Sequence, residues 1–241
     1  MSVVTTIQVK PREMRMMAER ILSLTSLPKG VFMTMPDHVM FSQGLGFGGF
    51  AMLEGRFEML KDADPSLLSI RSEDGSKMTL DCGGQHGWIA ASAIVDLLGE
   101  LVAKHGQAEI TCVDVDAPAE LGIVVPLARR AGLDVSVNAA DAPVLRARRL
   151  PLTGTLAADE PLLWTLLTEG ARIPADLWWR IYDMAKKALA PDTVVSRRHA
   201  GPMIVNDDGT VIGRKDNDDE TDISFLASTG LASTQAGDAK P

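Results

Sequence analysis

The fold is decided by residues 77–115, KMTLDCGGQHGWIAASAIVDLLGELVAKHGQAEITCVDV. Two short runs with apolar and β-branched residues, 77–82 and 109–115, flank a long Ala-, Leu- and Val-rich run over 88–104. Short runs of this kind are typical of strands, and a long apolar run followed by a glycine, here Gly106, is typical of a buried helix. The order strand, helix, strand predicts a crossover unit with parallel strands.

The same alternation continues on both sides of this unit, so we expect one α/β domain over 1–226 with a mixed, partly parallel central sheet. Its parts are predicted as a helical segment 10–62, a sheet-containing core 66–150, a helical and hairpin segment 158–215, and a disordered tail 227–241. Within these parts we expect strands over 67–71, 133–138 and 144–150, and helices from Pro11, from Pro36 and over 117–131, 162–169 and 175–190, with a hairpin over 202–214.

Composition limits the class of protein. The chain has 241 residues, of which 46% are hydrophobic and 23% charged, which is ordinary for a globular protein and excludes a disordered chain, a coiled coil or collagen. No apolar run approaches the roughly 20 residues of a membrane span, and residues 1–10 have no signal-peptide pattern. From these two absences we expect no membrane binding. Cys82 and Cys112 are too few for a disulfide framework, so we expect a cytoplasmic protein.

The negative charge is concentrated at the C-terminal end. The net charge is −8, and residues 206–241 hold eight acidic and three basic side chains, so the rest of the chain is nearly balanced. Nucleic-acid binding needs a basic face, which this balance does not provide, and we expect no nucleic-acid partner.

The turn between the first predicted strand and the long helix is the main candidate site. Ligands bind at the carboxyl ends of strands in open α/β sheets, glycines allow close approach of a backbone, and a helix N-terminus attracts anions. His86 is the candidate acid or base, and Cys82 is a nucleophile only if its pKa is lowered. The alternative is a glycine turn with an exposed histidine. The predicted ligand-binding residues here are Asp81, Gly83, Gly84, Gln85 and Gly87.

Two arginines farther along complete the predicted site. Arg197 and Arg198 are able to hold a carboxylate or phosphate in a bidentate manner, although they also fit a solvated basic turn paired with the acidic residues 216–222. The four histidines show no i, i+4 pairing, so no metal site is expected. The Gly44–Gly49 cluster fits either a phosphate loop or, without a preceding strand, a tight turn between helices.

The order of elements over 80–138 resembles the central part of the malate/L-lactate dehydrogenase family, which includes sulfolactate dehydrogenases and cyclic imino-acid reductases. The residues concerned are Asp81 with its glycine turn, the alanine-rich helix, His105-Gly106 and the next strand, helix and strand. The resemblance implies an α/β fold that is not a Rossmann fold, NAD(P) as the cofactor, and a dimer. The family's Ser-His-Gly motif corresponds here to Ser42-Gln43-Gly44 or to the Gly46-Phe47-Gly48 turn, and its Asn-Ser-Asn-His motif to Asp114-Val115-Asp116-Ala117, so both histidines are absent.

The ends of the chain resemble a second family. Leu27-Pro28, the late helix with Leu177-Trp178, and Ser196-Arg197 followed by Ala200-Gly201 resemble a proteobacterial domain-of-unknown-function family, which is itself similar to a shortened dehydrogenase. This family implies a bacterial protein and brings no known activity.

These observations together predict a degenerate relative of NAD(P)-dependent 2-hydroxy-acid or imino-acid oxidoreductases. It would bind a small anionic metabolite or nucleotide, or act as a non-catalytic homodimer or partner subunit. The first alternative is an active oxidoreductase that uses His86 as its acid or base. The second is an interaction protein that uses its N-terminal helices, because eight methionines lie between Met14 and Met59, where methionine fills either a core or an adaptable interface.

Overall fold

The chain divides into two compact units, Met1–Leu189 and Ala190–Pro241, which we describe separately. Arg197, Arg198 and the predicted tail 227–241 lie outside the residues whose structure is described. A computed structural model describes residues 5–138, 142–189, 203–208 and 210–213.

A five-stranded sheet forms one side of the first unit, with strand order β2-β3-β4-β6-β5. β3 and β4 are parallel, whereas the other neighbouring pairs are antiparallel, which confirms the predicted mixed α/β architecture. The second predicted crossover does not end beside β4, because β6 folds back from β5 and lies between the two. The strands are β2 (Ser69–Asp74), β3 (Lys77–Asp81), β4 (Gln107–Val113), β5 (Leu133–Asn138) and β6 (Val144–Arg149).

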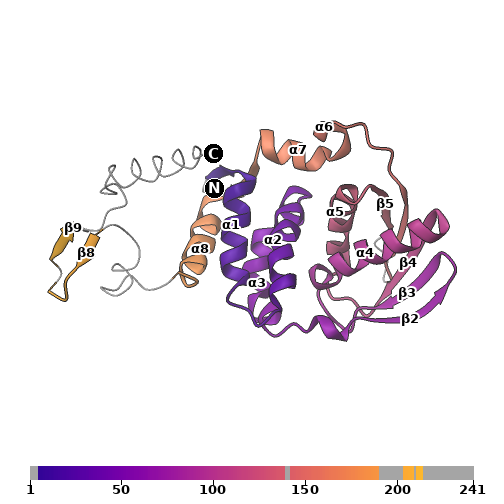
Figure 1. Cartoon of the computed structure of the whole chain (residues 1–241), viewed down its shortest axis with the longest axis horizontal. Helices are drawn as coiled ribbons and strands as arrows, with labels where there is room; N and C mark the ends of the chain where they lie inside the picture. The colour runs from indigo at the N-terminus through magenta and orange to yellow at the C-terminus, as the bar shows by residue number, and fades with distance from the viewer. Residues whose placement is uncertain (1–4, 139–141, 190–202, 209, 214–241) are drawn as a thin grey trace, which may run out of the picture. The chain divides into compact units, whose positions relative to one another are not determined.

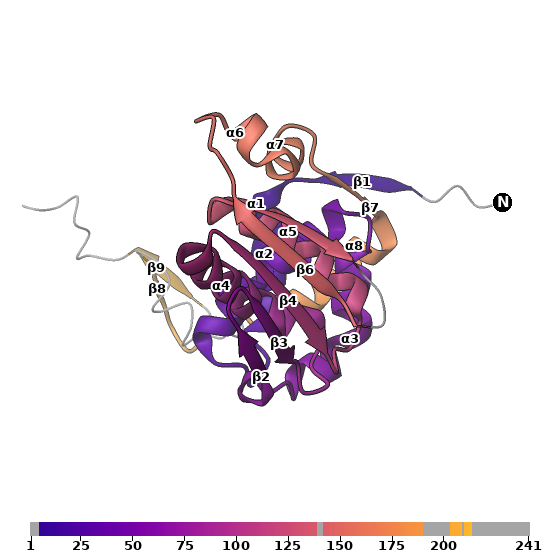
Figure 2. The same cartoon turned by 90° about the vertical axis from the view of Figure 1, so that its right-hand side faces the viewer.

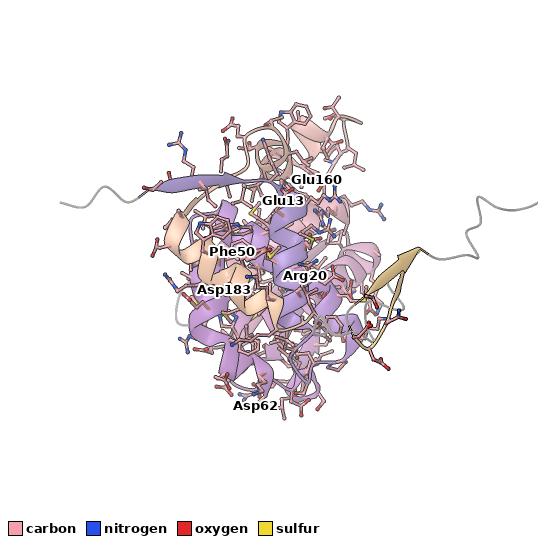
Figure 3. The ribbon with its side chains drawn as sticks, turned by 90° about the vertical axis from the view of Figure 1, so that its left-hand side faces the viewer. Glu13, Arg20, Phe50, Asp62, Glu160 and Asp183 are labelled. Carbon is pink, nitrogen blue, oxygen red and sulfur yellow. The ribbon has the colours of Figure 1, made fainter. Side chains whose placement is uncertain are left out.

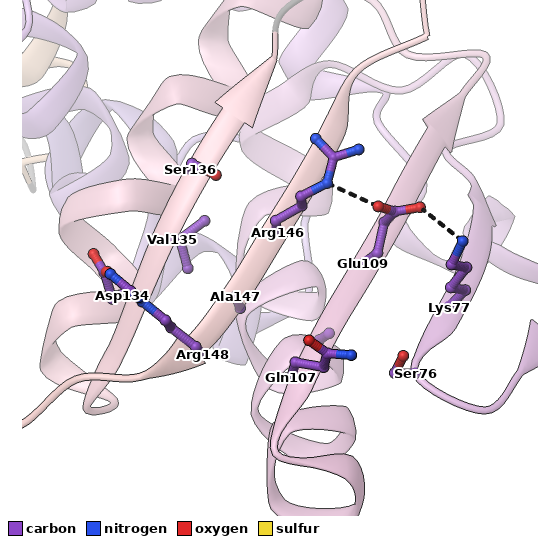
Figure 4. A pocket seen from close by; sticks show the side chains of 11 residues that line it. Ser76, Lys77, Gln107, Glu109, Asp134, Val135, Ser136, Arg146, Ala147 and Arg148 are labelled. Atoms are coloured by element: carbon purple, nitrogen blue, oxygen red, sulfur yellow. Dashed lines mark hydrogen bonds and ion pairs between the residues drawn. The ribbon is translucent and has the colours of Figure 1, made fainter.

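One face of this sheet packs on helices α4 (Gly87–His105) and α5 (Val124–Arg130), which lie behind the strands in Figure 2. In β4 the side chains alternate, so that Ala108, Ile110 and Cys112 are buried, as expected for a strand with one covered face. The opposite face is polar. It forms a shallow hollow in which Arg146 and Lys77 both reach Glu109, at 2.8 and 3.9 Å (Figure 4).

Four helices build the other side of the unit (Figure 1). Their buried faces form the core, and Phe50 meets Trp178 edge-on at 5.4 Å between ring centres; Figure 3 shows Phe50 among these helices. Of the eight N-terminal methionines, Met14, Met17, Met35 and Met40 are buried in this core. The helices are α1 (Pro11–Leu22), α2 (Lys29–Gly44), α3 (Gly49–Lys61) and α8 (Ala175–Lys186).

Two predicted helix starts were wrong. α2 begins at Lys29, with Pro28 before it, and Pro36 lies inside the helix, where its missing N–H removes one helical hydrogen bond. The helix predicted over 117–131 begins instead as the 3₁₀-helix η2 (Pro118–Ile123) and becomes α-helical only at Val124. The first error comes from reading Pro36 as a helix start, whereas packing accommodates this proline inside α2.

The glycine cluster forms the turn between α2 and α3, which is the second of the two predicted alternatives. Gly46 and Gly48 have φ angles of 83° and 81°, which favour glycine. A Cβ on Gly49 would lie 2.1 Å from the Val39 carbonyl oxygen, so the two helices approach more closely than any other residue allows. Gly46 and Gly48 therefore serve the backbone of the turn, and Gly49 serves the packing of the two helices.

The remaining elements of the first unit lie at its periphery. β1 pairs with β7 in a separate two-stranded antiparallel sheet. Among the described residues, no helix is long and apolar enough to cross a bilayer. The peripheral elements are β1 (Thr6–Val9), η1 (Pro65–Leu67), α6 (Leu156–Asp159), α7 (Pro161–Thr168) and β7 (Ala171–Pro174).

The second unit contains one described hairpin. β8 (Met203–Val205) and β9 (Val211–Gly213) pair antiparallel, and the Asn206 N–H donates to the Thr210 carbonyl at 2.8 Å. This confirms the hairpin predicted over 202–214 within its described residues.

Candidate functional site

The predicted glycine turn lies at the carboxyl end of the parallel pair β3 and β4, as the sequence predicts. It continues the pairing of the two strands, because the N–H groups of Cys82 and Gly84 donate to the carbonyl oxygens of Val113 and Asp114, at 2.9 and 2.8 Å. The turn is therefore held by main-chain hydrogen bonds along its length.

The polar side chains of the turn are also held within the protein. Asp81 accepts hydrogen bonds from the Gly83 N–H at 3.0 Å and from Arg71 at 2.6 and 2.9 Å. The Gly83 N–H and then Arg71 keep the pKa of Asp81 below its ordinary value. Gln85 accepts from the Asp64 N–H at 3.0 Å and donates to the Gly83 carbonyl at 3.3 Å. The turn uses these groups to fix its own shape.

At two of the three glycines of this turn, close packing against the protein leaves little or no room for a side chain. A Cβ on Gly83, whose φ is +58°, would lie 2.7 Å from the Leu67 carbonyl oxygen, and one on Gly87 would lie 3.3 Å from the Ala117 carbonyl oxygen. Gly84 has a φ of +68° but open space, with Asp114 at 4.0 Å. Only Gly84 has room for an approaching ligand.

His86 is fully buried, so the predicted alternative of a glycine turn with an exposed histidine is wrong about its exposure. It caps α4, since its Nδ1 accepts the Trp88 N–H at 3.2 Å, and its ring meets the Trp88 ring edge-on at 4.9 Å. Its Nε2 has no hydrogen-bond partner within the described part of the chain. Burial lowers the pKa of His86 from 6.5 to about 4, with Asp116 opposing and Arg56 adding to the shift, so the ring is neutral near pH 7.

The turn does not fit the phosphates of NAD(P). The first N–H groups of α4, which would hold an anion, already donate: Gly87 to the Asp116 carbonyl at 2.9 Å, and Trp88 and Ile89 to His86. Acidic side chains surround them. Asp116 pairs with Arg56 at 3.6 Å, and buried Glu120 accepts the Trp88 indole N–H at 2.7 Å.

A second buried histidine lines a pocket that the sequence did not reveal. The pocket has a volume of about 450 Å³ and lies between α1, α2, α4 and α5. Ser92, Val95 and Asp96 reach it at i, i+3 and i+4 on one face of α4, and Thr34 and His38 do so at i and i+4 on α2. The other lining residues are Arg15, Met33, Asp37 and Leu127.

His38 and Ser92 form the chemical centre of this pocket. The His38 Nε2 lies 3.1 Å from the Ser92 hydroxyl, which lies 3.5 Å from the Thr34 hydroxyl. Burial lowers the pKa of His38 from 6.5 to about 4, against smaller opposing effects of the Trp88 main chain and Asp37. His38 is 1% exposed, and its Nδ1 has no well-formed hydrogen bond to any described residue. A neutral ring facing a hydroxyl is able to accept or donate a hydrogen bond, depending on its tautomer.

Carboxylates outweigh cations along the wall of this pocket. Asp37 is paired with Arg15 at 3.0 Å and with Arg130 at 2.5 Å, so its charge is compensated. Asp96 has no ion-pair partner among the residues that the structure describes. The wall therefore suits hydroxyl, amide or amine groups better than an anion.

The chemistry of Ser92 favours binding over acyl transfer. Ser92 lies in the second turn of α4, where main-chain N–H groups are committed to helical hydrogen bonds and provide no oxyanion hole. A histidine with a pKa near 4 is also a weak general base near neutral pH.

The remaining predictions fare differently. Arg197 and Arg198 are not placed by the described residues, so their role stays a prediction. Cys82 and Cys112 are both buried, and the hydrogen bond between the two thiols lowers the pKa of Cys82, against burial, and raises the pKa of Cys112, together with burial. In the described part, His, Cys, Asp and Glu side chains form no group of three that could hold a metal ion.

His38 was not predicted as a site residue, because the histidines were compared only with residues four positions away in the sequence. The partner, Ser92, is 54 residues away and on another helix. The available signal was weak: one polar aromatic residue on the apolar, Met-rich face of α2.

Comparisons with known proteins show similarity in fold over about half the chain. No family model matches the chain, and no curated protein matches it. Malate dehydrogenase from Entamoeba histolytica aligns with 14% identity and a TM-score of 0.45, over 55% of this chain and 38% of that one. Malate dehydrogenase from Pyrococcus horikoshii aligns with 12% identity and a TM-score of 0.41, over 55% and 40%.

Sulfolactate dehydrogenase from Methanocaldococcus jannaschii aligns with 13% identity and a TM-score of 0.40, over 53% of this chain and 38% of that one. The chain thus spans less than half the length of these structures. These alignments show a distant structural similarity to malate and sulfolactate dehydrogenases over about half of this chain, and no family model supports either resemblance.

Proposed function

We propose that this protein binds a small polar metabolite, uncharged or cationic, in the pocket around His38 and Ser92. The observation that carries the proposal is a neutral, buried histidine that lines a pocket of about 450 Å³ with its Nε2 3.1 Å from the Ser92 hydroxyl. This volume lies within the range of roughly 300–1,000 Å³ that is usual for small-molecule sites. The pocket also brings hydroxyl, imidazole and carboxylate groups from two helices to one place.

This proposal refines the predicted function. A pocket whose histidine is a weak base near pH 7 agrees with the predicted non-catalytic, ligand-binding role. The anionic ligand predicted from the sequence does not suit this pocket, because Asp96 is unpaired among the described residues and Asp37 already holds two arginines. Whether the protein acts as a homodimer or a partner subunit stays a prediction.

The experiment is a ligand screen read by NMR on protein with labelled histidines. The probes are amino alcohols, polyols, polyamines and nucleosides at millimolar concentration. We expect at least one probe to shift the His38 ring signals saturably and to leave the His86 signals unchanged. The control pair is Asp96→Asn, which should change the affinity for a cationic probe, and Asp62→Asn, an exposed acid on α3's C-cap that should not. If no probe moves the His38 signals, the proposal is wrong.

A second candidate keeps the predicted site at the glycine turn. Two observations favour it: the buried His86 Nε2 is unpartnered in the described residues, and the neighbouring Ala117 has a φ of +53°, which costs roughly 1–2 kcal/mol in a residue other than glycine. In this candidate His86 would be the acid or base of an oxidoreductase, as predicted.

Nucleotide binding tests this second candidate directly. Because the N–H groups of the turn already have acceptors, we expect titration of NADH and NADPH, followed by fluorescence and calorimetry, to show no saturable binding at micromolar concentration. Saturable binding that is lost in His86→Gln and kept in His38→Gln would revive the oxidoreductase and place it at the turn.

A further inference from the structure

A third pocket, independent of both histidines, lies where α7 packs against α2 and α5. Its volume is about 260 Å³, and its wall is mostly apolar. Phe41 and Leu45 line it from α2, Val125 from α5, and Leu162 and Leu163 from α7. Because the volume is below the roughly 300 Å³ at which drug-sized sites begin, it suits a short apolar group.

Two charged residues also line this pocket, and only one of them has an ionic partner. Glu160 accepts from Arg130 at 2.9 Å, and the guanidinium of Arg130 also pairs with Asp37 and lies 5.0 Å from the centre of the Phe41 ring. The charge of Glu160 is therefore compensated without help from Arg129.

Arg129 is a half-buried guanidinium without a carboxylate partner among the described residues. Its Nη1 donates to the carbonyl oxygens of Asp159 at 3.0 Å and of Ala158 at 3.5 Å. The Asp159 carboxylate is directed elsewhere, since it accepts from the N–H groups of Thr153 and Gly154 at 2.8 and 2.9 Å. A guanidinium has five N–H donors, so most of those of Arg129 remain available.

We propose that this pocket binds a small monocarboxylate with a short apolar chain. The chain would lie against the leucines, Val125 and Phe41, and the carboxylate would accept hydrogen bonds from the free N–H groups of Arg129. Partial burial of a charged group costs free energy, and a bound carboxylate would offset more of that cost for Arg129 than its two carbonyl acceptors do. An uncharged apolar ligand would leave that arginine unpaired, so the carboxylate is the feature that the site recognises.

The experiment compares hexanoate with 1-hexanol, which has the same chain without the charge, on the full-length protein. Calorimetry gives the affinities, and methyl NMR of leucine and valine locates the ligand. We expect hexanoate to bind saturably and to shift the methyl signals of Leu45, Val125, Leu162 and Leu163. 1-Hexanol should bind at least tenfold more weakly.

Variants separate the arginine from general effects. Arg129→Gln should weaken hexanoate at least tenfold and leave 1-hexanol unchanged, whereas Arg149→Gln, at an exposed arginine of β6 outside the pocket, should leave both unchanged. Val125→Phe, which fills the pocket, should abolish both. Equal affinities for the two ligands in the wild-type protein would overturn the proposal. So would changes confined to methyl signals of residues outside this pocket. The wild-type comparison does not depend on whether Arg129→Gln folds, and neither result bears on the His38 pocket.

Discussion

His38 and His86 both have a lowered pKa, but their side chains make different contacts. Both are buried, and burial lowers the pKa of each from 6.5 to about 4. Both also lie against Trp88: His38 near its main chain, and His86 against its ring. They differ in what they touch: His86 caps α4 inside a turn whose main-chain N–H groups mostly donate within the protein, and its Nε2 meets no described partner, whereas His38 lines a pocket and faces Ser92.

This difference shows that a lowered pKa does not by itself mark a functional group. A buried histidine is neutral whether it stabilises a helix end or lines a binding site, because desolvation opposes the charged form in both places. What separates the two is access for a ligand and the number of free polar partners. We therefore assign His86 mainly to folding and His38 to binding.

The first expected effect concerns acid, where the two histidines should behave alike. The folded protein keeps both rings neutral down to about pH 4, whereas the unfolded chain takes up protons below its ordinary pKa of 6.5. The unfolded state therefore binds more protons in this window, so the free energy of unfolding is highest above pH 6.5 and falls as the pH is lowered. We expect a loss of roughly 2 kcal/mol per histidine between about pH 7 and pH 5.

Urea unfolding at these two pH values measures this loss in the wild-type protein and in His38→Gln, His86→Gln and the double variant. Each single variant should remove about half of the histidine contribution. The difference from wild type is the relevant quantity, because burial raises the pKa of Glu120, which acts in the opposite direction. A single variant that removes the entire effect would break the equivalence of the two histidines.

The next effect tests whether the glycine turn serves packing. Gly83→Ala and Gly84→Ala both place a side chain at positive φ, which costs roughly 1–2 kcal/mol. Only Gly83→Ala also brings a Cβ within 2.7 Å of the Leu67 carbonyl oxygen, so it should lower the free energy of unfolding by roughly 2–5 kcal/mol in total. Urea denaturation of the matched pair decides the point, and equal losses would show that the contact with Leu67 is unimportant.

The smallest effect separates the capping histidine from the pocket histidine. His86→Leu replaces the imidazole with an apolar side chain of similar size. It loses the hydrogen bond that the Trp88 N–H donates to His86, which should cost about 1 kcal/mol. His86→Asn restores an N-cap side chain and should recover part of this loss. At His38, which caps no helix, asparagine should give no such recovery over leucine. Thermal unfolding at pH 7.5 measures all four variants, and recovery at both positions would contradict the assignment.

Much of the fold could be predicted from residue patterns. The apolar run of α4 and its glycine at Gly106, which adopts a φ of 77°, fix a helix and its end by local chemistry alone. The strands β3 and β4 and the hairpin β8–β9 follow from alternation and turn residues in the same way. Pro36 was misread because a buried proline inside α2 depends on packing that no local pattern contains.

The candidate site divides along the same line. The sequence by itself determined that Asp81–Gly87 forms a tight turn between a strand and a buried helix, since the conformational freedom of glycine acts over a few residues. Only the tertiary structure decided that most main-chain N–H groups of this turn find acceptors within the protein, and that His38 of α2 meets Ser92 of α4 in a pocket. The physical reason is range: local preferences fix backbone conformation within a segment, whereas burial and access depend on which segments pack together.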